Sequence, residues 1–142
     1  MTQLSKNFTL RELIKSDTAT RKGINNAPPQ SVIDNLKYLC ENLLQPIRDM
    51  VGIVTINSGY RSPALNKAVG GAKNSQHLTG QAVDFESVQY SNIELGKMIE
   101  ESGLVFDQLI YEFVSKKNPR AGWIHISLVK DGTNRKQVLW VA

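Results

Sequence analysis

The stretch QSVIDNLKYLCENLLQPIRDMVGIVTIN, residues 30–57, contains the change of hydrophobic period that decides the fold. Over residues 30–50, apolar side chains recur at intervals of three and four, which predicts one core helix with a continuous apolar stripe. Pro46 is expected to kink or divide this helix, because proline lacks a backbone donor and crowds the preceding turn. After Gly52 the residues become β-branched, and residues 53–57 are predicted to form a strand.

Shorter elements are expected on both sides of this stretch. Thr9 and Glu12 form a capping-box pattern, which predicts a short helix over residues 10–16. Residues 18–29, which are rich in turn formers and end in two prolines, are expected to form a loop. The other expected elements are a helix from Ser62 to about Val69, a strand over residues 81–85, a helix over residues 91–103, and strands over residues 106–113, 122–128 and 136–142.

The order of these elements predicts the fold class. Helices come mostly first and strands last, which favours an α+β fold with helices packed mainly on one face of an antiparallel sheet. The Asp131-Gly132 turn is expected to join the last two strands as a hairpin. Residues 1–142 are predicted to form a single domain, since the length suits one core. Cys40, the only cysteine, is expected to be a buried thiol.

Composition restricts the class of partner. The 17 Lys and Arg residues outnumber the 13 Asp and Glu residues, which gives a net charge of +4. Basic residues are scattered and do not interleave with aromatic ones, so nucleic acid is not expected as a partner. No segment approaches the roughly 20 apolar residues of a membrane span, and the N-terminal segment does not resemble a signal peptide. The protein is therefore expected to be made as a soluble cytoplasmic product and to act as a monomer.

Two potential metal ligands lie within NSQHLTGQAVDF, residues 74–85. His77 precedes Asp84 by seven positions, and Gly80 between them allows the backbone to fold back so that both side chains converge. A catalytic zinc ion takes three protein ligands from His, Asp, Glu and Cys, and keeps its fourth position for water. The spacing alone also fits an ordinary hydrogen-bonded histidine beside an aspartate.

The third ligand has one histidine candidate, since His125 is the only other histidine. It lies in the middle of the predicted strand WIHIS. Strand alternation places it with Trp123 and Ser127 on one face, and places Ile124 and Ile126 on the other face. The isoleucines indicate the core side, so His125 is expected to point away from the core.

Three blocks of sequence resemble the zinc D-alanyl-D-alanine carboxypeptidases and peptidoglycan endopeptidases, metallopeptidases with a hedgehog-like zinc site. SGYRS, residues 58–62, and WIHIS, residues 123–127, are similar to the outer blocks of that family. The resemblance extends from about residue 53 to residue 128, and the helical N-terminal part is similar to compact, phage-associated members. The central block matches the pattern SxHxxGxAxD, with Ser75, His77, Gly80, Ala82 and Asp84 at its fixed positions.

The resemblance implies a zinc cleft on the face of the sheet opposite the helices. Its ligands are implied to be His77, Asp84 and His125. Arg61 is implied to neutralise a substrate carboxylate or to stabilise the developing oxyanion. Ser75 is expected to orient a ligand and contribute to substrate binding, and Trp123 is expected to form a wall of the cleft.

The general base is assigned to Glu112. Many relatives have a glutamate three residues before the second histidine, but this position is Gly122 here. Glu112 is implied to take the equivalent place from the neighbouring strand, with Asp107 or a bound water as the alternative. Strand alternation places Gln108, Ile110 and Glu112 on one face and Leu109, Tyr111 and Phe113 on the other.

The expected function is therefore that of a zinc-dependent peptidase acting on the peptide part of bacterial peptidoglycan. Its partners would be peptidoglycan stem peptides or cross-links, and its cofactor would be Zn²⁺. It would act as a carboxypeptidase or as an endolysin-type endopeptidase. It would reach the cell wall after holin-type release or as a virion component, while a cytoplasmic role on wall precursors is also compatible. The alternatives are a non-catalytic zinc-binding module of the same fold, and a basic module that binds the wall or nucleic acid without a metal.

Overall fold

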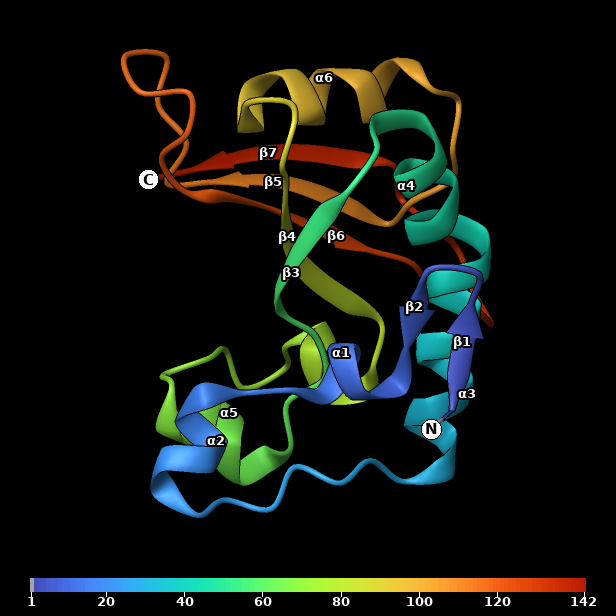
Figure 1. Ribbon diagram of the computed structural model, residues 1–142, viewed down its shortest axis with the longest axis vertical. Coiled ribbons are helices and arrows are strands. Elements are labelled where there is room, and N and C mark those ends of the chain that lie inside the picture. The colour runs from blue at the N-terminus through green and yellow to red at the C-terminus, as the bar shows by residue number, and fades with distance from the viewer. Residues whose placement is uncertain (1) are drawn as a thin grey trace.

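A five-stranded sheet forms the centre of the protein in the computed structural model, which describes residues 2–142 (Figure 1). The strand order is β3-β4-β6-β5-β7, and every neighbouring pair is antiparallel except β5 and β7. This sheet and its helices confirm the predicted α+β fold. The strands are β3 (Val54–Ser58), β4 (Ala82–Ser87), β5 (Gln108–Glu112), β6 (Trp123–Ser127) and β7 (Gln137–Val141).

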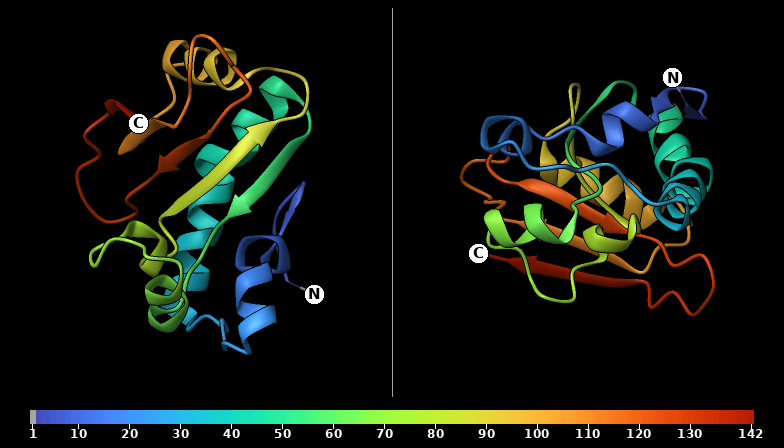
Figure 2. Two further views of the ribbon diagram at one scale, coloured as in Figure 1. Left: turned by 90° about the vertical axis from the view of Figure 1, so that its left-hand side faces the viewer. Right: turned by 90° about the horizontal axis from the view of Figure 1, so that it is seen from below.

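Helical segments cover one face of the sheet, and shorter ones lie in the N-terminal part of the chain and in the connection between β3 and β4. The column formed by α3, η1 and α4 packs against one face of the sheet, and α6 lies against β4, β5 and β6 on the same face (Figures 1 and 2). None of the described helices has the length and apolarity needed to cross a membrane. The helical segments are α1 (Leu10–Ile14), α2 (Asp17–Lys22), α3 (Gln30–Leu39), the π-helix η1 (Cys40–Leu44), α4 (Gln45–Val51), α5 (Pro63–Ala68), the 3₁₀ helix η2 (Gln76–Thr79) and α6 (Asn92–Glu101).

The hydrophobic core lies between these helices and one face of the sheet. The helix column contributes a stripe of fully buried leucines and isoleucine, and α6 adds Leu95 and Ile99. Burial of this apolar surface is the main favourable term in folding. Because helices cover this face, the polar side chains of β4, β5 and β6 point to the opposite face. The sheet residues in the core are Val83, Phe85, Leu109, Tyr111, Ile124 and Ile126.

The long helix is interrupted before Pro46. The backbone N–H of Gln45 donates to the carbonyl of Cys40, five residues back, which widens the last turn of η1. A wider turn leaves room for the proline ring, which would clash with the carbonyl four residues before it in a regular helix. The predicted division is therefore confirmed, and it takes the form of a π-helical turn. Cys40 is buried as expected, and burial raises the pKa of its thiol.

The expected loop over residues 18–29 is wrong in its first part, because α2 occupies Asp17–Lys22. The hydroxyl of Ser16 accepts a hydrogen bond from the N–H of Ala19 at 3.1 Å, and the helix ends at Gly23. These residues are ordinary start and stop signals for a helix. The preceding helix α1 is correspondingly shorter than predicted and ends at Ile14.

The predicted hairpin between the last two strands is also wrong. β6 pairs with β4 along one edge and with β5 along the other, so neither edge is free for β7. Residues 128–136 instead carry the chain past β5, and β7 adds to the outer edge of β5 in parallel. A short N-terminal hairpin of β1 (Gln3–Ser5) and β2 (Phe8–Thr9) was not expected, since its strands are too short to give a pattern.

A buried carboxylate joins three segments at one end of the sheet. Asp107, just before β5, accepts hydrogen bonds from the backbone N–H, Nε and Nη2 of Arg135 at 3.0, 2.9 and 2.8 Å. It also accepts one from Nε2 of Gln76 at 3.0 Å. The contacts with Arg135, and then that with Gln76, lower the pKa of Asp107 from its ordinary 3.8 to about 2. Asp107 thereby ties η2 and the segment before β7 to the sheet.

We expect Asp107→Asn to reduce the free energy of unfolding in a manner that depends on pH. A carboxyl group with a lowered folded-state pKa contributes stability above its unfolded pKa and loses it as pH falls through the folded value. The variant should therefore be less stable than the wild type by about 1–2 kcal/mol at pH 7. Between pH 4 and pH 2 this difference should shrink. Urea unfolding at a series of pH values measures it, and a constant difference would contradict the prediction.

Candidate metal centre

Two of the three predicted ligands face each other across neighbouring strands. Asp84 on β4 and His125 on β6 are direct partners in the antiparallel register. Their side chains lie on the face opposite the core, and Nδ1 of His125 is 2.9 Å from Oδ1 of Asp84. The alternation predicted for WIHIS is confirmed, because Ile124 and Ile126 are fully buried in the core.

The third predicted ligand, His77, comes from η2 in the connection that leads into β4. Its Nε2 lies 3.3 Å from Oδ1 of Asp84, and its Nδ1 lies 2.7 Å from the carbonyl oxygen of Gly59. A proton on Nδ1 donated to that carbonyl leaves the lone pair of Nε2 facing Asp84. Gly80 ends η2 with φ at +72°, and a Cβ there would lie 2.8 Å from the carbonyl oxygen of Val32. Only glycine therefore fits this turn, as the sequence predicted.

These three side chains form a group that could hold a metal ion. One ligand atom from each lies within 4.8 Å of the others. A tetrahedral zinc ion with ligand distances of 2.0–2.1 Å places its ligand atoms roughly 3.3 Å apart, close to the 3.3 and 2.9 Å from Oδ1 of Asp84 to the two imidazole nitrogens. The donor set of two imidazoles and one carboxylate also suits zinc. The residues therefore fit a zinc ion without rearrangement of the strands.

Asp84 is held in its ionised form by its two neighbours. Its side chain is buried, and burial alone would raise the pKa of its carboxyl group. The contacts with His125 and His77 outweigh this effect and leave the pKa below its usual value. The carboxylate is thus available as a metal ligand.

Glu112 lies next to this group on β5. Its Oε2 is 3.9 Å from Nδ1 of His125 and accepts a hydrogen bond from Nε1 of Trp123 at 2.8 Å. Gly122 has φ at +71°, and a Cβ there would lie 2.0 Å from the carbonyl oxygen of Glu112. A glutamate at position 122 would therefore not fit. Asp107, the alternative base, has its carboxylate engaged by Arg135 and Gln76.

The loop that carries Arg61 is fixed on two sides. The N–H of Tyr60 donates to the carbonyl of Leu13 in α1 at 2.7 Å, and the N–H of Arg61 donates to the carbonyl of His77 at 3.1 Å. The N-terminal helix thus supports the loop whose Gly59 carbonyl orients His77. This contribution of α1 to the site has no signal in the sequence.

The guanidinium of Arg61 lies beside the candidate site. Burial lowers its pKa, while the charges of Asp84 and Glu112 act in the opposite direction. Its Nε is buried and finds no hydrogen-bond partner within residues 2–142. The side chain therefore retains donor capacity that the protein itself does not use.

Ser75 and Trp123 are also close to the group. The hydroxyl of Ser75 accepts a hydrogen bond from the backbone N–H of His77 at 3.2 Å, so it orients the ligand segment through the backbone. Trp123 lines the same cavity as the three ligands and holds Glu112 through its indole N–H. The structure thus brings all of the predicted site residues to one region.

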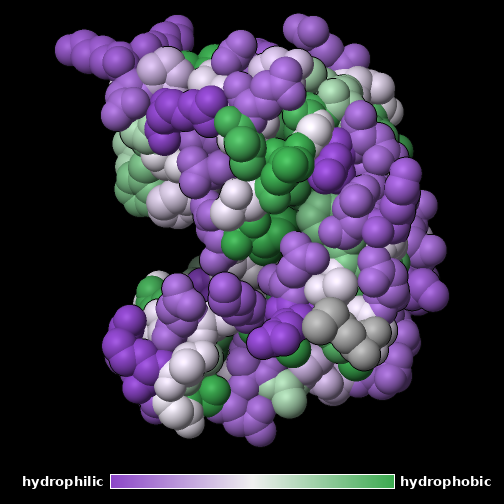
Figure 3. All heavy atoms as spheres, viewed as in Figure 1, coloured by the Kyte–Doolittle hydropathy of each residue, from purple (hydrophilic) through white to green (hydrophobic). Residues whose placement is uncertain are grey.

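A cleft runs past the candidate ligands. Figure 3 shows it as a deep hollow between the sheet and the part of the molecule formed by α2 and α5. The cavity at the ligands has a volume of about 780 Å³, and a neighbouring cavity of about 440 Å³ shares Arg61 and Asp84 with it. Residues that the sequence did not suggest also line the larger cavity, among them Val69, Phe113 and Arg135.

We expect the protein to bind one zinc ion per chain and to lose this binding when a ligand is removed. His77→Ala, Asp84→Ala and His125→Ala should each weaken zinc affinity by more than about 100-fold, since removal of an outer partner alone costs 10–100-fold. Asp131→Ala, in an exposed loop, is the matched control and should bind as the wild type does. Competition with a chelator of known affinity measures the binding. Unchanged affinity in the three ligand variants would exclude this centre.

Comparison with known proteins agrees with the geometry. A search of curated proteins finds no match to the chain. The family model described as Peptidase M15 matches residues 6–127. This range includes all three candidate ligands together with Arg61 and Glu112. Membership of this family agrees with the resemblance seen in the sequence and, together with the metal-ligand group, indicates a metallopeptidase. The chain therefore belongs to the Peptidase M15 family.

Proposed function

We propose that the chain is a zinc-dependent peptidase that hydrolyses the peptide part of bacterial peptidoglycan. The observation that carries this proposal is the position of Glu112, whose carboxylate lies 3.9 Å from Nδ1 of His125, beside the three candidate ligand atoms. A proton acceptor and a metal site in one cleft are the two components that hydrolysis of a peptide bond by activated water requires.

Glu112 is the proposed general base. A zinc ion held by His77, Asp84 and His125 would lower the pKa of a nearby water molecule and polarise the scissile carbonyl. Glu112 accepts the proton of the attacking water and passes it to the departing amine. The hydrogen bond from Trp123 keeps the Glu112 carboxylate turned toward the ligands while it carries the proton.

Arg61 is the proposed anion-stabilising residue. It lines both cavities of the cleft, and its Nε has no partner within the described chain. Partial burial strengthens its interaction with a charge in the cleft, because the local dielectric is lower than that of water. Arg61 would therefore bind a substrate carboxylate or offset the negative charge that develops on the scissile carbonyl oxygen.

Peptidoglycan stem peptides or cross-links are the proposed substrates. The support is the resemblance of SGYRS, the SxHxxGxAxD block and WIHIS to enzymes that cut these peptides. Ser75 and Trp123 contribute to the substrate site in this proposal. Both a carboxypeptidase and an endolysin-type endopeptidase fit it, and the similarity to compact phage-associated members favours a setting in phage lysis or in a virion.

A non-catalytic zinc-binding module is the second candidate. The observation that favours it is Gly122, which replaces the glutamate that many relatives have at this position. In that case the three ligands would bind zinc and the cleft would bind a ligand without cleaving it. The two candidates differ in whether Glu112 carries a proton.

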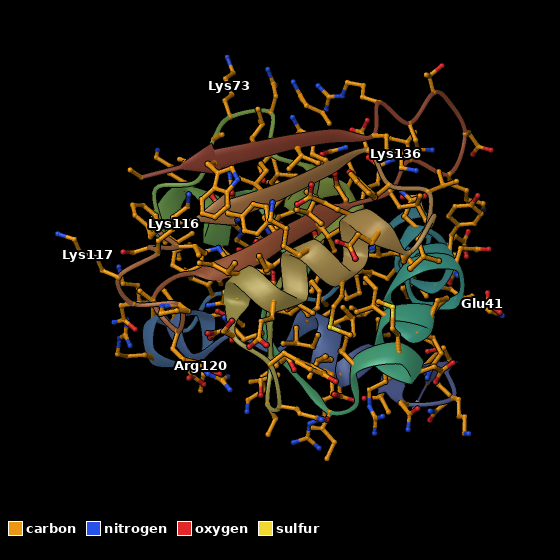
Figure 4. The ribbon with its side chains drawn as sticks, turned by 90° about the horizontal axis from the view of Figure 1, so that it is seen from above. Glu41, Lys73, Lys116, Lys117, Arg120 and Lys136 are labelled. Carbon is orange, nitrogen blue, oxygen red and sulfur yellow. The ribbon has the colours of Figure 1, made fainter. Side chains whose placement is uncertain are left out.

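We expect Glu112→Gln to abolish most of the activity while zinc binding is retained. Glutamine keeps the shape of the side chain and can still accept from Trp123, but it cannot accept a proton, so kcat should fall roughly 10²–10⁴-fold. Glu41→Gln is the matched control, since Glu41 is exposed on η1 (Figure 4), and η1 packs against the core face of the sheet, opposite the ligands. Mass spectrometry of digested peptidoglycan measures the products and identifies the bond. Products at an equal rate from wild type and Glu112→Gln would remove Glu112 from the mechanism.

We expect Arg61→Lys to be a damaging substitution although it keeps the charge. Lysine is a point charge on a flexible stem and does not reproduce the fixed donors of the guanidinium, so kcat/KM should fall about 10–100-fold. Arg21→Lys, on the exposed side of α2, provides the control. Steady-state kinetics on a soluble stem peptide compares the two variants. Equal loss in both would indicate that Arg61 has no special role.

A further inference from the structure

Phe113 has an unusual backbone conformation at the end of β5. Within residues 2–142, only Phe113 and Lys136 are non-glycine residues with positive φ, at 56° and 52°. Strand alternation predicts that Phe113 lies on the core face with Leu109 and Tyr111. This prediction is wrong, because the left-handed conformation turns the side chain out of the core face. Phe113 as a residue is 55% exposed, and it lines the cleft.

Two neighbours hold Phe113 in this conformation. Its N–H donates to the carbonyl of Val141 at the end of β7, at 2.7 Å. On its other side the backbone lies against Gly122, where a Cβ would be 2.6 Å from the carbonyl carbon of Phe113. A left-handed conformation is strained for a bulky residue and persists only where the surroundings enforce it. An exposed apolar ring gains little burial in return, so stability does not account for this arrangement.

The ring of Phe113 forms one side of an apolar corner beside the candidate base. Its centroid lies 5.3 Å from that of Trp123, and the two ring planes are inclined by 48°. Trp123 donates to Glu112, which directly precedes Phe113 in the chain. Because the indole N–H of Trp123 lies 2.8 Å from the Glu112 carboxylate, this corner lies directly beside the group that would act on the scissile bond. Ile110 lines the same cavity.

We propose that Phe113 and Trp123 form a subsite that binds the aliphatic side chain of the substrate residue next to the scissile bond. The inference rests on the proposed peptidase function. Two rings in contact and inclined by 48° present two apolar faces that meet at an angle, and a narrow aliphatic side chain can pack against both, whereas a sugar ring stacks on one flat face. A subsite so close to Glu112 also favours a side chain of the peptide over the more distant glycan. Phe113 is thus a specificity-determining residue, and its strained backbone serves to place the ring in the cleft.

Phe113→Gly in the zinc-loaded full chain separates this role from a structural one. Glycine readily adopts positive φ, so the melting temperature should rise by roughly 2–5 °C. KM for a soluble stem peptide should rise about tenfold with kcat nearly unchanged, as expected for loss of uniform binding. Lys136→Gly is the matched control, because it relieves the same conformation at the start of β7, whereas Glu112 and Phe113 lie beside Val141 at the end of β7. Figure 4 shows Lys136 on the opposite side of the molecule from Lys116 and Lys117, which follow Phe113 in the chain. Lys136→Gly should raise the melting temperature and leave KM unchanged.

Substrate variants complete the test. In a set of synthetic stem peptides, each residue that flanks the cleaved bond is replaced in turn by glycine. We expect kcat/KM of the wild type to fall about tenfold for the replacement at one of these positions. Phe113→Gly should show no such loss at that position. An unchanged KM in Phe113→Gly, or a glycine effect as large as in the wild type, would overturn the subsite.

A binding measurement distinguishes failure of the subsite from failure of the peptidase proposal. If the wild type cleaves no stem peptide, the peptidase proposal fails. Tryptophan fluorescence titration of the same peptides into zinc-loaded protein then tests the subsite alone. If Phe113→Gly binds the peptides more weakly than Lys136→Gly does, the subsite is supported as a binding site. Equal binding of the peptides by the two variants, or no binding by either, would overturn the subsite.

Discussion

The pairing of Asp84 with His125 across β4 and β6 is the contact on which the candidate site depends. A shift of this pairing by one residue would turn every side chain of one strand to the other face of the sheet. The register is fixed from the core side, where the alternating neighbours on both strands are fully buried. These neighbours are Val83, Phe85, Ile124 and Ile126. The hydrophobic core therefore determines the position of two polar side chains that it does not contact.

The sequence predicted the parts of the site that follow from local pattern. Strand alternation in WIHIS placed His125 opposite the core, and Gly80 indicated the turn that returns His77 to Asp84. Similarity to known peptidases then connected segments that are far apart in the chain. The topology at the C-terminus was not predictable in this way, because the choice of edge for β7 depends on which edges β4 and β5 already occupy.

Other features depend on close contacts between distant segments. Gly122 appeared in the sequence as the loss of a catalytic residue, yet the carbonyl of Glu112 occupies the space that a side chain at 122 would need. Phe113 followed the alternating pattern of a core residue, and only its backbone conformation places it in the cleft. The contact of Leu13 with the loop that carries Arg61 likewise arises from packing. Local pattern does not encode such contacts.

X-ray absorption spectroscopy of the zinc-loaded protein tests the central claim most directly. A zinc ion held by His77, Asp84 and His125 should have nitrogen and oxygen ligands only, at about 2.0–2.1 Å, with the multiple-scattering features of two imidazoles and a coordination number of about four. A zinc–sulfur distance of about 2.3 Å, which would involve Cys40, or a shell without imidazole would contradict the account.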